Sequence, residues 1–491
     1  MNKLYFALDR LCGNRWFPLL FIPIAVCFLL LYSTSTSPFY LWDGCDSVIF
    51  KTMGLAVIQG KIPYRDIFDH KGPVLYLIEA LGQWMIPGNN GILILQCLSL
   101  SVTLLFLFKM AKLFVNSILS FIWVIVALGI MGVFFEGGNV TEEWNLPYLV
   151  IPSYYAMANF TRNSDFTHPY KYALIYGLCF GMSFFIRPND AVAQVGGVML
   201  GVTLWMLYQK QYENMFKNVL FFALGFIIIA LPIIVWFGVN GALGDLFYGL
   251  IQFNGKYSYG LLYMVRSAIG KDKLKFFMFF VVLIVMVYNT TYKKLLVLLL
   301  SVLSLVVVFM GTKLYPHYYI VVAPYFMLFF VFLCLQKNKS IILCSIAVIL
   351  ASHIDTLKIA RKTPKTNIKH AVNVIKNGIE ESPFYEETGE LLELVPDNER
   401  NTIWNYNLDF HVAMLWHQGL TQINKVPLYS MYQVDERLKE DDNIILKRPK
   451  YVLFSEVNSR DSLDYKFIVT NYELVAKTDT SVCNITLFKK R

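Results

Sequence analysis

Acid and base side chains concentrate in one polar stretch near the N-terminus, between residues 35 and 90. Its ionisable side chains include Asp43, Asp46, Arg65, Asp66, Asp69, His70 and Lys71. A carboxylate can take a proton from an attacking hydroxyl group, and cations can hold a phosphate that departs as a leaving group. The stretch therefore has the residue types for general-base transfer from a phosphate-linked substrate. For any single residue, the alternative is a charge that only keeps the loop solvated.

Further candidate residues follow later in the chain. Glu142 and Glu143 stand in a second acidic turn, Arg187 ends an apolar run, and His317 stands beside Tyr318 near the start of another. A guanidinium at that depth is costly unless it pairs with an anion, although a long side chain can also reach water from there. A lone histidine is more often structural than catalytic, so spacing alone gives His317 little weight.

Motifs for several other classes of enzyme and for transporters are absent from the sequence or only weakly matched. The sequence has no GxxxxGK, GxGxxG, HExxH or GxSxG motif, and its eight cysteines form no CxxC pair. The pairs Asp43/Asp46 and Asp66/Asp69 suggest a magnesium-diphosphate prenyltransferase, but both stand in one loop rather than on facing helices. The apolar runs hold few charges, so a chain of buried carboxylates for proton-coupled transport is not visible.

The composition indicates a membrane protein. Of the 491 residues, 56% are hydrophobic and 16% are charged, whereas soluble domains have about 25% charged residues. Runs long enough to cross a roughly 30 Å hydrocarbon layer recur about eleven times. They lie near residues 17–34, 91–109, 118–135, 144–160, 172–187, 190–208, 218–238, 275–289, 295–311, 319–335 and 340–357. No small-residue cleavage site follows the first run, so we interpret it as a retained helix.

The basic residues predict how these runs are oriented. If the N-terminus is cytoplasmic, every cytoplasmic turn carries Lys or Arg, as the positive-inside rule requires. The outward-facing segments are then residues 35–90, 136–143, 187–190, 239–274 and 312–318, together with the C-terminal tail. All candidate residues therefore share the outward side. The amphipathic stretches Ser47–Ile58 and Val74–Ile86 are predicted to be interfacial helices of the first outward loop.

Two domains are predicted, a membrane body over residues 1–360 and a soluble extracytoplasmic domain over residues 361–491. The second holds 18 Lys and Arg against 19 Asp and Glu, so the first carries a net charge of +10 and the whole chain +9. Runs rich in β-branched and aromatic residues at 450–455 and 483–488 favour strands, and a small α/β domain is expected. The basic residues of the body stand in short loops beside apolar runs, which favours membrane lipid as the anionic partner and gives no argument for nucleic acid.

These motifs resemble those of integral-membrane glycosyltransferases of the GT-C fold. The resemblance is carried by the acidic motif of the first outward loop, the interfacial helices, and Lys71-Gly72-Pro73 where Lys-Pro-Pro is usual. It is strongest with the bacterial branch near protein mannosyltransferases and aminoarabinose transferases. The similarity spans most of residues 35–325, and Trp42–Leu81 is its most specific part. It implies a polytopic α-helical protein of about eleven transmembrane helices.

The resemblance also implies catalytic roles. Asp46 falls where the family places its first-loop catalytic acid and would be the general base, with Asp43 as the alternative. Glu142 or Glu143 matches the acidic position of the second loop. The family usually has Asp there, so the use of a divalent metal ion stays open, and no other cofactor is implied.

A second set of residues would bind the substrate. Lys71 matches the family lysine that approaches the donor phosphate, and the motifs around Arg187 and His317 resemble outward-facing phosphate sites. The whole expected substrate-binding set is Arg65, Asp69, His70, Lys71, Arg187, His317 and Tyr318.

Taken together, the resemblance implies transfer of a sugar, with inversion, from a polyprenyl-phosphate donor to an acceptor hydroxyl. The acceptor is a glycan, a lipid or a protein on the outer face of a bacterial cytoplasmic membrane. The alternative is a flippase for lipid-linked oligosaccharides or a polysaccharide polymerase, without monosaccharide transfer. A third interpretation makes the tail a binding module and the membrane body its anchor.

Overall fold

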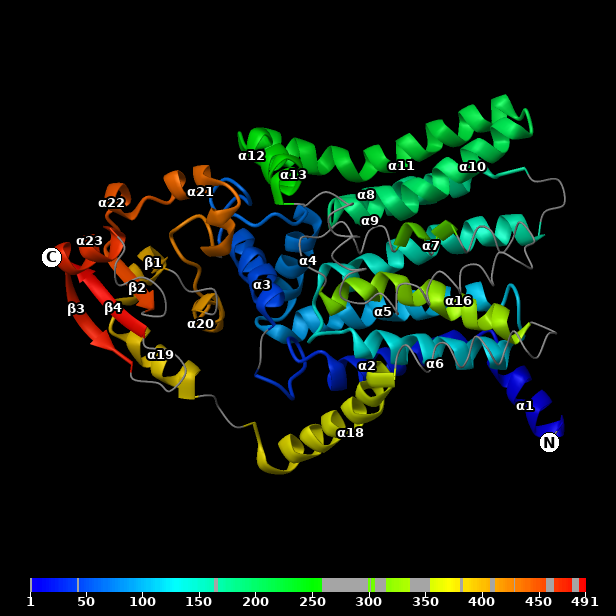
Figure 1. Cartoon of the computed structure of the whole chain (residues 1–491), viewed down its shortest axis with the longest axis horizontal. Coiled ribbons are helices and arrows are strands. Elements are labelled where there is room, and N and C mark those ends of the chain that lie inside the picture. Colours follow the sequence, from blue (N-terminus) through cyan, green and yellow to red (C-terminus); the bar gives the residue numbers. More distant parts are fainter. Residues whose placement is uncertain are drawn as a thin grey trace. The chain divides into compact units, whose positions relative to one another are not determined.

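The computed structural model describes residues 2–41, 44–162, 167–257, 299–300, 302–304, 315–335, 354–379, 383–406, 411–427, 429–455, 463–478 and 485–491 (Figure 1). Asp43 lies outside these residues, as do all or most of the predicted spans near 275–289, 295–311 and 340–357.

The chain divides into two compact units, each built from separate stretches of sequence. The first unit comprises residues 1–33, 95–233 and 258–371, and the second comprises residues 34–94, 234–257 and 372–491. The first outward loop and the C-terminal residues therefore belong to the same unit. This division does not test where the membrane body ends, so the predicted boundary at residue 360 stays a prediction.

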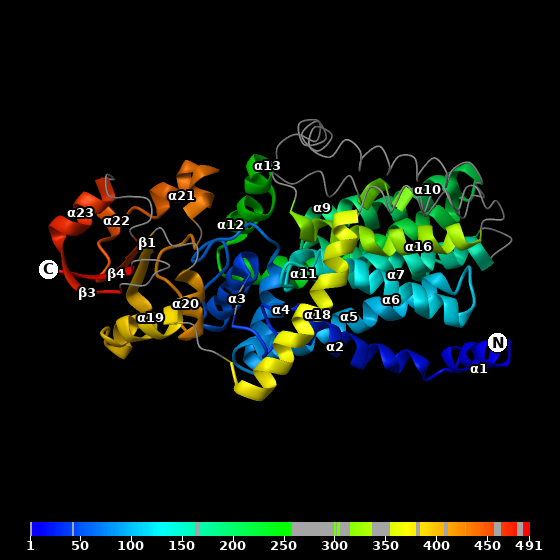
Figure 2. The ribbon, with the colours of Figure 1, turned by 60° about the horizontal axis from the view of Figure 1, so that its bottom comes forward.

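Helices form the described part of the first unit, and the longer ones run side by side (Figures 1 and 2). They are α1 (Asn2–Cys12), η1 (Phe17–Leu20), α2 (Phe21–Tyr32), α6 (Ser117–Val133), α7 (Thr141–Arg162), α8 (Tyr170–Phe184), α9 (Pro188–Asp190), η2 (Ala191–Gly196), α10 (Gly197–Tyr208), η4 (Pro316–Val322) and α16 (Ala323–Cys334). Three further helices, α5 (Asn89–Ala111), α11 (Tyr212–Val239) and α18 (Ile354–Asn377), have residues in both units.

Three described helices are long and apolar enough to cross a membrane. They are α5, the continuous helix from Pro188 to Tyr208, which includes the π-helix η2, and α11. A bent pair formed by Tyr5–Cys12 and Phe17–Tyr32 adds a fourth if it is one span. These helices coincide with predicted runs. The predicted total of about eleven spans stays a prediction.

Glycines let α8 and α11 approach each other closely. A Cβ atom at Gly177 would lie 2.0 Å from the carbonyl oxygen of Phe222, and one at Gly225 would lie 2.4 Å from that of Leu174. Neither position has room for a side chain. Small residues at helix crossings are typical of membrane proteins, because in lipid the helices associate by close packing rather than by the hydrophobic effect.

The second unit begins with the two helices of the first outward loop. They are α3 (Cys45–Ile58) and α4 (Pro73–Met85), close to the predicted bounds. The two helices pack tightly at Gly54, where a Cβ atom would lie 2.6 Å from Cβ of Glu79. The segment after α11 adds α12 (Leu243–Phe247), the π-helix η3 (Tyr248–Gln252) and α13 (Phe253–Tyr257).

The C-terminal residues form a four-stranded sheet with helices around it. Its strands are β1 (Ile403–Tyr406), β2 (Tyr451–Ser455), β3 (Tyr472–Lys477) and β4 (Ile485–Lys490), in the order β1-β2-β4-β3. The first pair is parallel and the other two are antiparallel. The helices are α19 (Pro383–Glu393), η5 (Asp397–Thr402), α20 (His411–His417), η6 (Tyr429–Gln433), α21 (Glu436–Asp441), α22 (Ile444–Lys447) and α23 (Leu463–Asn471).

Both faces of β2 are buried, because alternate residues of a strand point to opposite sides of the sheet. Leu453 belongs to one apolar cluster with Ile403 and Leu487. Its neighbours Val452 and Phe454 belong to a second cluster. The predicted strands at 450–455 and 483–488 therefore correspond to β2 and β4, which are the two central strands.

Hydrogen bonds join the C-terminal residues to the first outward loop within the second unit. Trp416 donates its indole N–H to Oε1 of Gln83 over 2.8 Å, and its ring lies 4.6 Å from the Lys51 ammonium. The backbone N–H of Phe68 donates to the carbonyl oxygen of Lys425 over 2.7 Å. Residues more than three hundred positions later therefore hold the loop between α3 and α4, and α4 itself, in place through hydrogen bonds.

Candidate functional site

Two tyrosines, one in the loop from Gln59 to Gly72 and one in α4, fix the backbone of Lys71. The hydroxyl groups of Tyr64 and Tyr76 lie 2.6 Å and 2.9 Å from the Lys71 carbonyl oxygen. Both tyrosines are fully buried. The next residues, Gly72 and Pro73, begin α4, and proline suits this position because its fixed φ matches the first turn of a helix.

Asp69, His70 and Lys71 form a chain of polar contacts. Nδ1 of His70 lies 3.3 Å from Oδ1 of Asp69, and Nε2 of His70 lies 3.2 Å from Nζ of Lys71. Asp69 and His70 are buried, and Lys71 is half-buried. A neutral imidazole with its proton on Nδ1 suits both contacts, since it places the proton next to the carboxylate and leaves Nε2 to accept from the ammonium group.

The surroundings favour this neutral form of His70. Burial and the positive charge of Lys71 lower the pKa of His70 below its ordinary value of 6.5, although Asp69 and Asp46 act in the opposite direction. Burial acts to raise the pKa of Asp69, but the contact with His70 and the charge of Lys71 outweigh it and lower that pKa. Near pH 7 the cluster therefore holds a carboxylate, a neutral imidazole and an ammonium group.

A pH dependence of stability follows from His70. Below about pH 6.5 the unfolded chain binds a proton on this side chain, whereas the folded chain resists it, so the folded state loses stability as the pH falls. We expect the melting temperature of the detergent-purified protein to fall more steeply between pH 7.5 and pH 5.5 for the wild type than for His70→Gln. Parallel curves for the two proteins would contradict this. The contribution of Asp69 lies at lower pH, because its depressed pKa keeps it ionised below its ordinary range.

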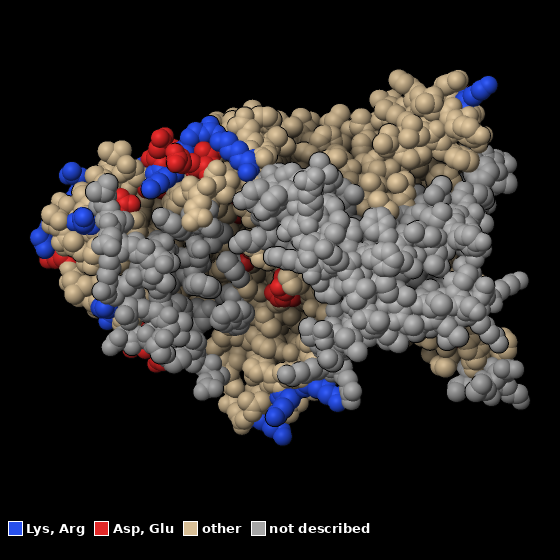
Figure 3. Space-filling view, in the orientation of Figure 1, with Lys and Arg blue, Asp and Glu red and all other residues tan. Residues whose placement is uncertain are grey.

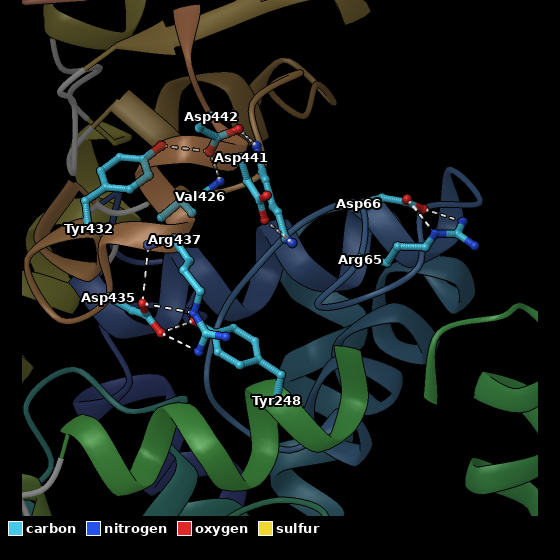
Figure 4. Close-up of polar contacts among 10 residues, drawn as sticks. Arg65, Asp66, Tyr248, Val426, Tyr432, Asp435, Arg437, Asp441 and Asp442 are labelled. Atoms are coloured by element: carbon cyan, nitrogen blue, oxygen red, sulfur yellow. Dashed lines mark hydrogen bonds and ion pairs between the residues drawn. The ribbon is translucent and has the colours of Figure 1, made fainter. Parts of the chain in front are cut away.

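Asp46 stands on the neighbouring helix of the same unit. It occupies the first turn of α3 and is half-buried, and its negative charge acts on His70. Arg65 differs from these residues, because it is exposed and forms an ion pair with Asp66 (Figure 4). It also donates to the carbonyl oxygen of Asn240 over 2.7 Å. The structure thus brings Asp46, Asp69, His70 and Lys71 together. Arg65 instead contacts Asp66 and Asn240.

Two residues of α13 contact His70. Asn254 donates to the His70 carbonyl oxygen over 2.8 Å, and the ring of Tyr257 lies 4.6 Å from the imidazole ring. The π-helix η3 places Gly249 against Tyr64, where a Cβ atom would lie 2.2 Å from the ring. The segment from Tyr248 to Tyr257 therefore holds both His70 and the tyrosine that fixes Lys71.

Asp435 in turn anchors that segment to the C-terminal residues. It accepts from Tyr248 over 2.7 Å, and Arg437 lies 3.1 Å from it (Figure 4). It also accepts from Lys256 over 2.6 Å. Asp435 is buried, and these partners lower its pKa despite burial. Nothing in the local sequence around Asp435 indicated this contact, because its partners lie about 180 residues earlier.

A separate cluster lies in the first unit around Arg187. Its guanidinium forms an ion pair with Glu142, lies 3.4 Å from Asp190 and stacks over the ring of Tyr318 at 4.5 Å. Asn145 donates to Asp190 over 2.8 Å. Arg187 is therefore a buried, paired cation rather than an anchor that reaches water. Asp190 was not among the residues expected from the sequence, although it stands two positions after Pro188 of the Arg187-Pro188 motif.

His317 and Glu143 lie near this cluster in the first unit but have different partners. Nδ1 of His317 lies 2.6 Å from Glu136, and its ring packs edge-on against Tyr318. Glu143 accepts from the backbone N–H of Asn139 over 2.8 Å and from Gln96. Of the two second-loop acids, Glu142 is thus the one that contacts Arg187.

The buried ion pair predicts a large loss of stability when it is broken. Arg187→Gln leaves Glu142 and Asp190 buried without their cation, which typically costs about 3–5 kcal/mol. We expect a clearly lower melting temperature in detergent, and partial recovery in Glu142→Gln/Arg187→Gln, since the second change removes an uncompensated charge. Lys217→Gln, which breaks the exposed pair with Glu213, serves as control and should change little. Additive losses in the double variant would contradict the pairing.

The described part of the chain contains no group of three or more His, Cys, Asp or Glu side chains placed to hold a metal ion. Asp43 lies outside that part, and the use of a divalent metal ion stays open, as it was from the sequence.

Comparison with known proteins supports the fold. No protein-family model matches the chain, and no curated protein matches it. Among solved structures, the chain is similar to ArnT from Cupriavidus metallidurans bound to undecaprenyl phosphate, with a TM-score of 0.57 and 10% identity over 96% of this chain and 97% of that one. It is less similar to the Archaeoglobus fulgidus oligosaccharyltransferase tethered to an acceptor peptide, with a TM-score of 0.49 and 12% identity over 90% and 69%.

The likeness to ArnT extends over nearly the whole of both chains. This protein therefore has the GT-C fold of a polytopic membrane protein, as the sequence motifs predicted. At 10% identity the likeness establishes the fold and does not identify the substrates.

Proposed function

We propose that this protein is a glycosyltransferase that moves a sugar from a polyprenyl-phosphate donor to an acceptor hydroxyl, with inversion at the anomeric carbon. The observation that carries the proposal is the cluster of Asp46, Asp69, His70 and Lys71 in the first outward loop of a chain with the GT-C fold. The cluster combines a half-buried carboxylate with a cation whose position is fixed by buried neighbours. The structural neighbour ArnT, which was solved with undecaprenyl phosphate, is consistent with a lipid-phosphate donor.

In the proposed reaction the acceptor oxygen attacks the anomeric carbon, and the bond from that carbon to the phosphate oxygen breaks. Asp46 takes the proton of the acceptor hydroxyl, and the departing polyprenyl phosphate carries the negative charge. Asp43 remains the alternative base. The products are the glycosylated acceptor and polyprenyl phosphate.

Lys71 neutralises the phosphate in this mechanism. An ammonium group has three donors, and the contact with His70 uses one of them. His70 stays neutral and orients the ammonium group, and Asp69 holds the imidazole in the required tautomer. Fixed cations stabilise a leaving group best when they need not reorganise during the reaction, and the two tyrosines on the Lys71 carbonyl provide this rigidity.

The residues of the first unit form the second part of the proposal. Arg187 and His317, with Tyr318 between them, are proposed to contact the anionic part of the donor, and Glu142 holds Arg187 in place. The acceptor is proposed to be a cell-surface glycan, a lipid or a protein. We also propose that the protein lies in the bacterial cytoplasmic membrane, with its N-terminus cytoplasmic and its C-terminal residues outside.

The test is sugar transfer by the purified full-length protein in lipid nanodiscs. A panel of polyprenyl-phosphate monosaccharides is supplied with crude envelope acceptor, and release of polyprenyl phosphate is measured for the wild type and for a protein lacking the candidate base. Release with one donor by the wild type alone would support the proposal and name the donor. No release with any donor would overturn it in favour of a flippase or a polymerase.

A further inference from the structure

Helix α18 differs in composition from the apolar helices that precede it. It runs from Ile354 to Asn377 and carries six basic residues against one acidic residue, Asp355. It begins inside the last predicted span, at residues 340–357, and continues beyond it. A helix that directly follows a spanning segment is kept close to the membrane surface.

One side of α18 exposes a stripe of large apolar side chains. Ile368, Val372 and Ile375 are 50%, 44% and 71% exposed. Their spacing of four and three residues places them on one face of the helix. Aliphatic side chains arranged in this way are typical of a surface that is covered by an apolar medium.

A stripe of lysines runs beside the apolar one. Lys365, Lys369 and Lys376 are exposed and share a line along the helix, rotated by roughly 60° from the apolar stripe. The opposite side carries uncharged polar residues, among them Thr366 and Asn373. In Figure 3, basic groups gather over the region occupied by α18 in Figure 1.

From this pattern we propose that α18 lies in the membrane–water interface and binds anionic lipid headgroups. The apolar stripe inserts at the level of the glycerol and upper acyl groups, and the lysines contact headgroup phosphates beside it. Charge favours this occupant over a second copy of the chain, because a symmetric contact through the stripe would bring two rows of lysines together. The proposal rests on α18 alone and does not depend on sugar transfer.

The test is photo-crosslinking from position 375 in the full-length protein. Benzoylphenylalanine replaces Ile375, the protein is placed in nanodiscs of mixed phosphatidylcholine and phosphatidylglycerol, and the adducts are identified by mass spectrometry. The same group at Ile228, an exposed position of the spanning helix α11, is the reference for the lipid composition of the bilayer. We expect phosphatidylglycerol to be enriched severalfold among the adducts at position 375 relative to position 228.

Charge variants separate the role of the lysine stripe from general attraction. Lys365→Gln/Lys369→Gln/Lys376→Gln should return the adducts at 375 to the reference ratio. Lys439→Gln/Lys447→Gln/Lys466→Gln removes the same charge from exposed positions near the C-terminus and should leave the enrichment intact. Equal lipid ratios at positions 375 and 228 in the wild type would overturn the proposal. So would adducts at 375 with a second protein chain.

Discussion

Replacing Asp46 by asparagine is expected to lower sugar transfer at least about 100-fold, because positioned general bases contribute at least that much to such reactions. The change is nearly isosteric, and Asp46 is only half-buried in the first turn of α3, so the fold should be kept. The measurement is the initial rate of polyprenyl phosphate release, with the melting temperature recorded on the same preparation.

Asp441→Asn is the matched control for Asp46. It removes an aspartate of the same unit that is 54% exposed and forms an ion pair with Lys425, so transfer should stay at the wild-type rate. If Asp46→Asn retains activity, Asp46 is not the base, and Asp43→Asn becomes the decisive variant. A loss of transfer in Asp441→Asn would show that the effect of removing an aspartate is not specific to Asp46.

Replacing Lys71 by methionine is expected to lower transfer about 100-fold or more, the usual cost of removing one fixed group that stabilises developing charge. Methionine keeps most of the length of the side chain but cannot donate to phosphate. The same change should weaken inhibition by added polyprenyl phosphate, since the product presents the same phosphate. This second readout separates a role in binding phosphate from a general loss of structure.

The control for Lys71 is Lys439→Met, which removes an exposed lysine near the C-terminus. Its rate and its inhibition by polyprenyl phosphate should match those of the wild type. If Lys71→Met loses activity but keeps wild-type inhibition by polyprenyl phosphate, Lys71 does not hold the phosphate. The loss of activity would then come from the lost contact between Lys71 and His70.

Local patterns in the sequence predicted the helices and the central strands well. Amphipathic spacing placed α3 and α4 within two residues of their observed ends, and aromatic and β-branched runs located β2 and β4. The sequence did not indicate β1 and β3. β1 is buried but has only four residues, which is too short to give a clear pattern in the sequence. The middle of β3 is exposed, so β3 lacks the apolar run of a central strand.

The candidate site was predictable only where its parts are close in sequence. Asp69, His70 and Lys71 are consecutive, so their common loop was evident, and Asp46 was placed with them by the family motif. The pairing of Arg187 with Glu142 joins two segments far apart in the chain. Asn254 and Asp435 support His70 and its neighbours from segments that share no pattern with the first loop. Contacts of this kind arise from the tertiary fold and leave no local signal.

The hydrogen bonds behind the first loop have a consequence for biosynthesis. Gln59 and Lys61 donate to the carbonyl oxygens of Gly419 and Gln422, which are 360 and 361 residues later. The ribosome makes the loop about 360 residues before its partners, so the loop cannot form these hydrogen bonds until that much more of the chain has been translated. The loop that carries Lys71 is thus fully packed long after it has been made. Nascent chains that stop short of these partners should expose it to proteases even after every preceding helix has entered the membrane.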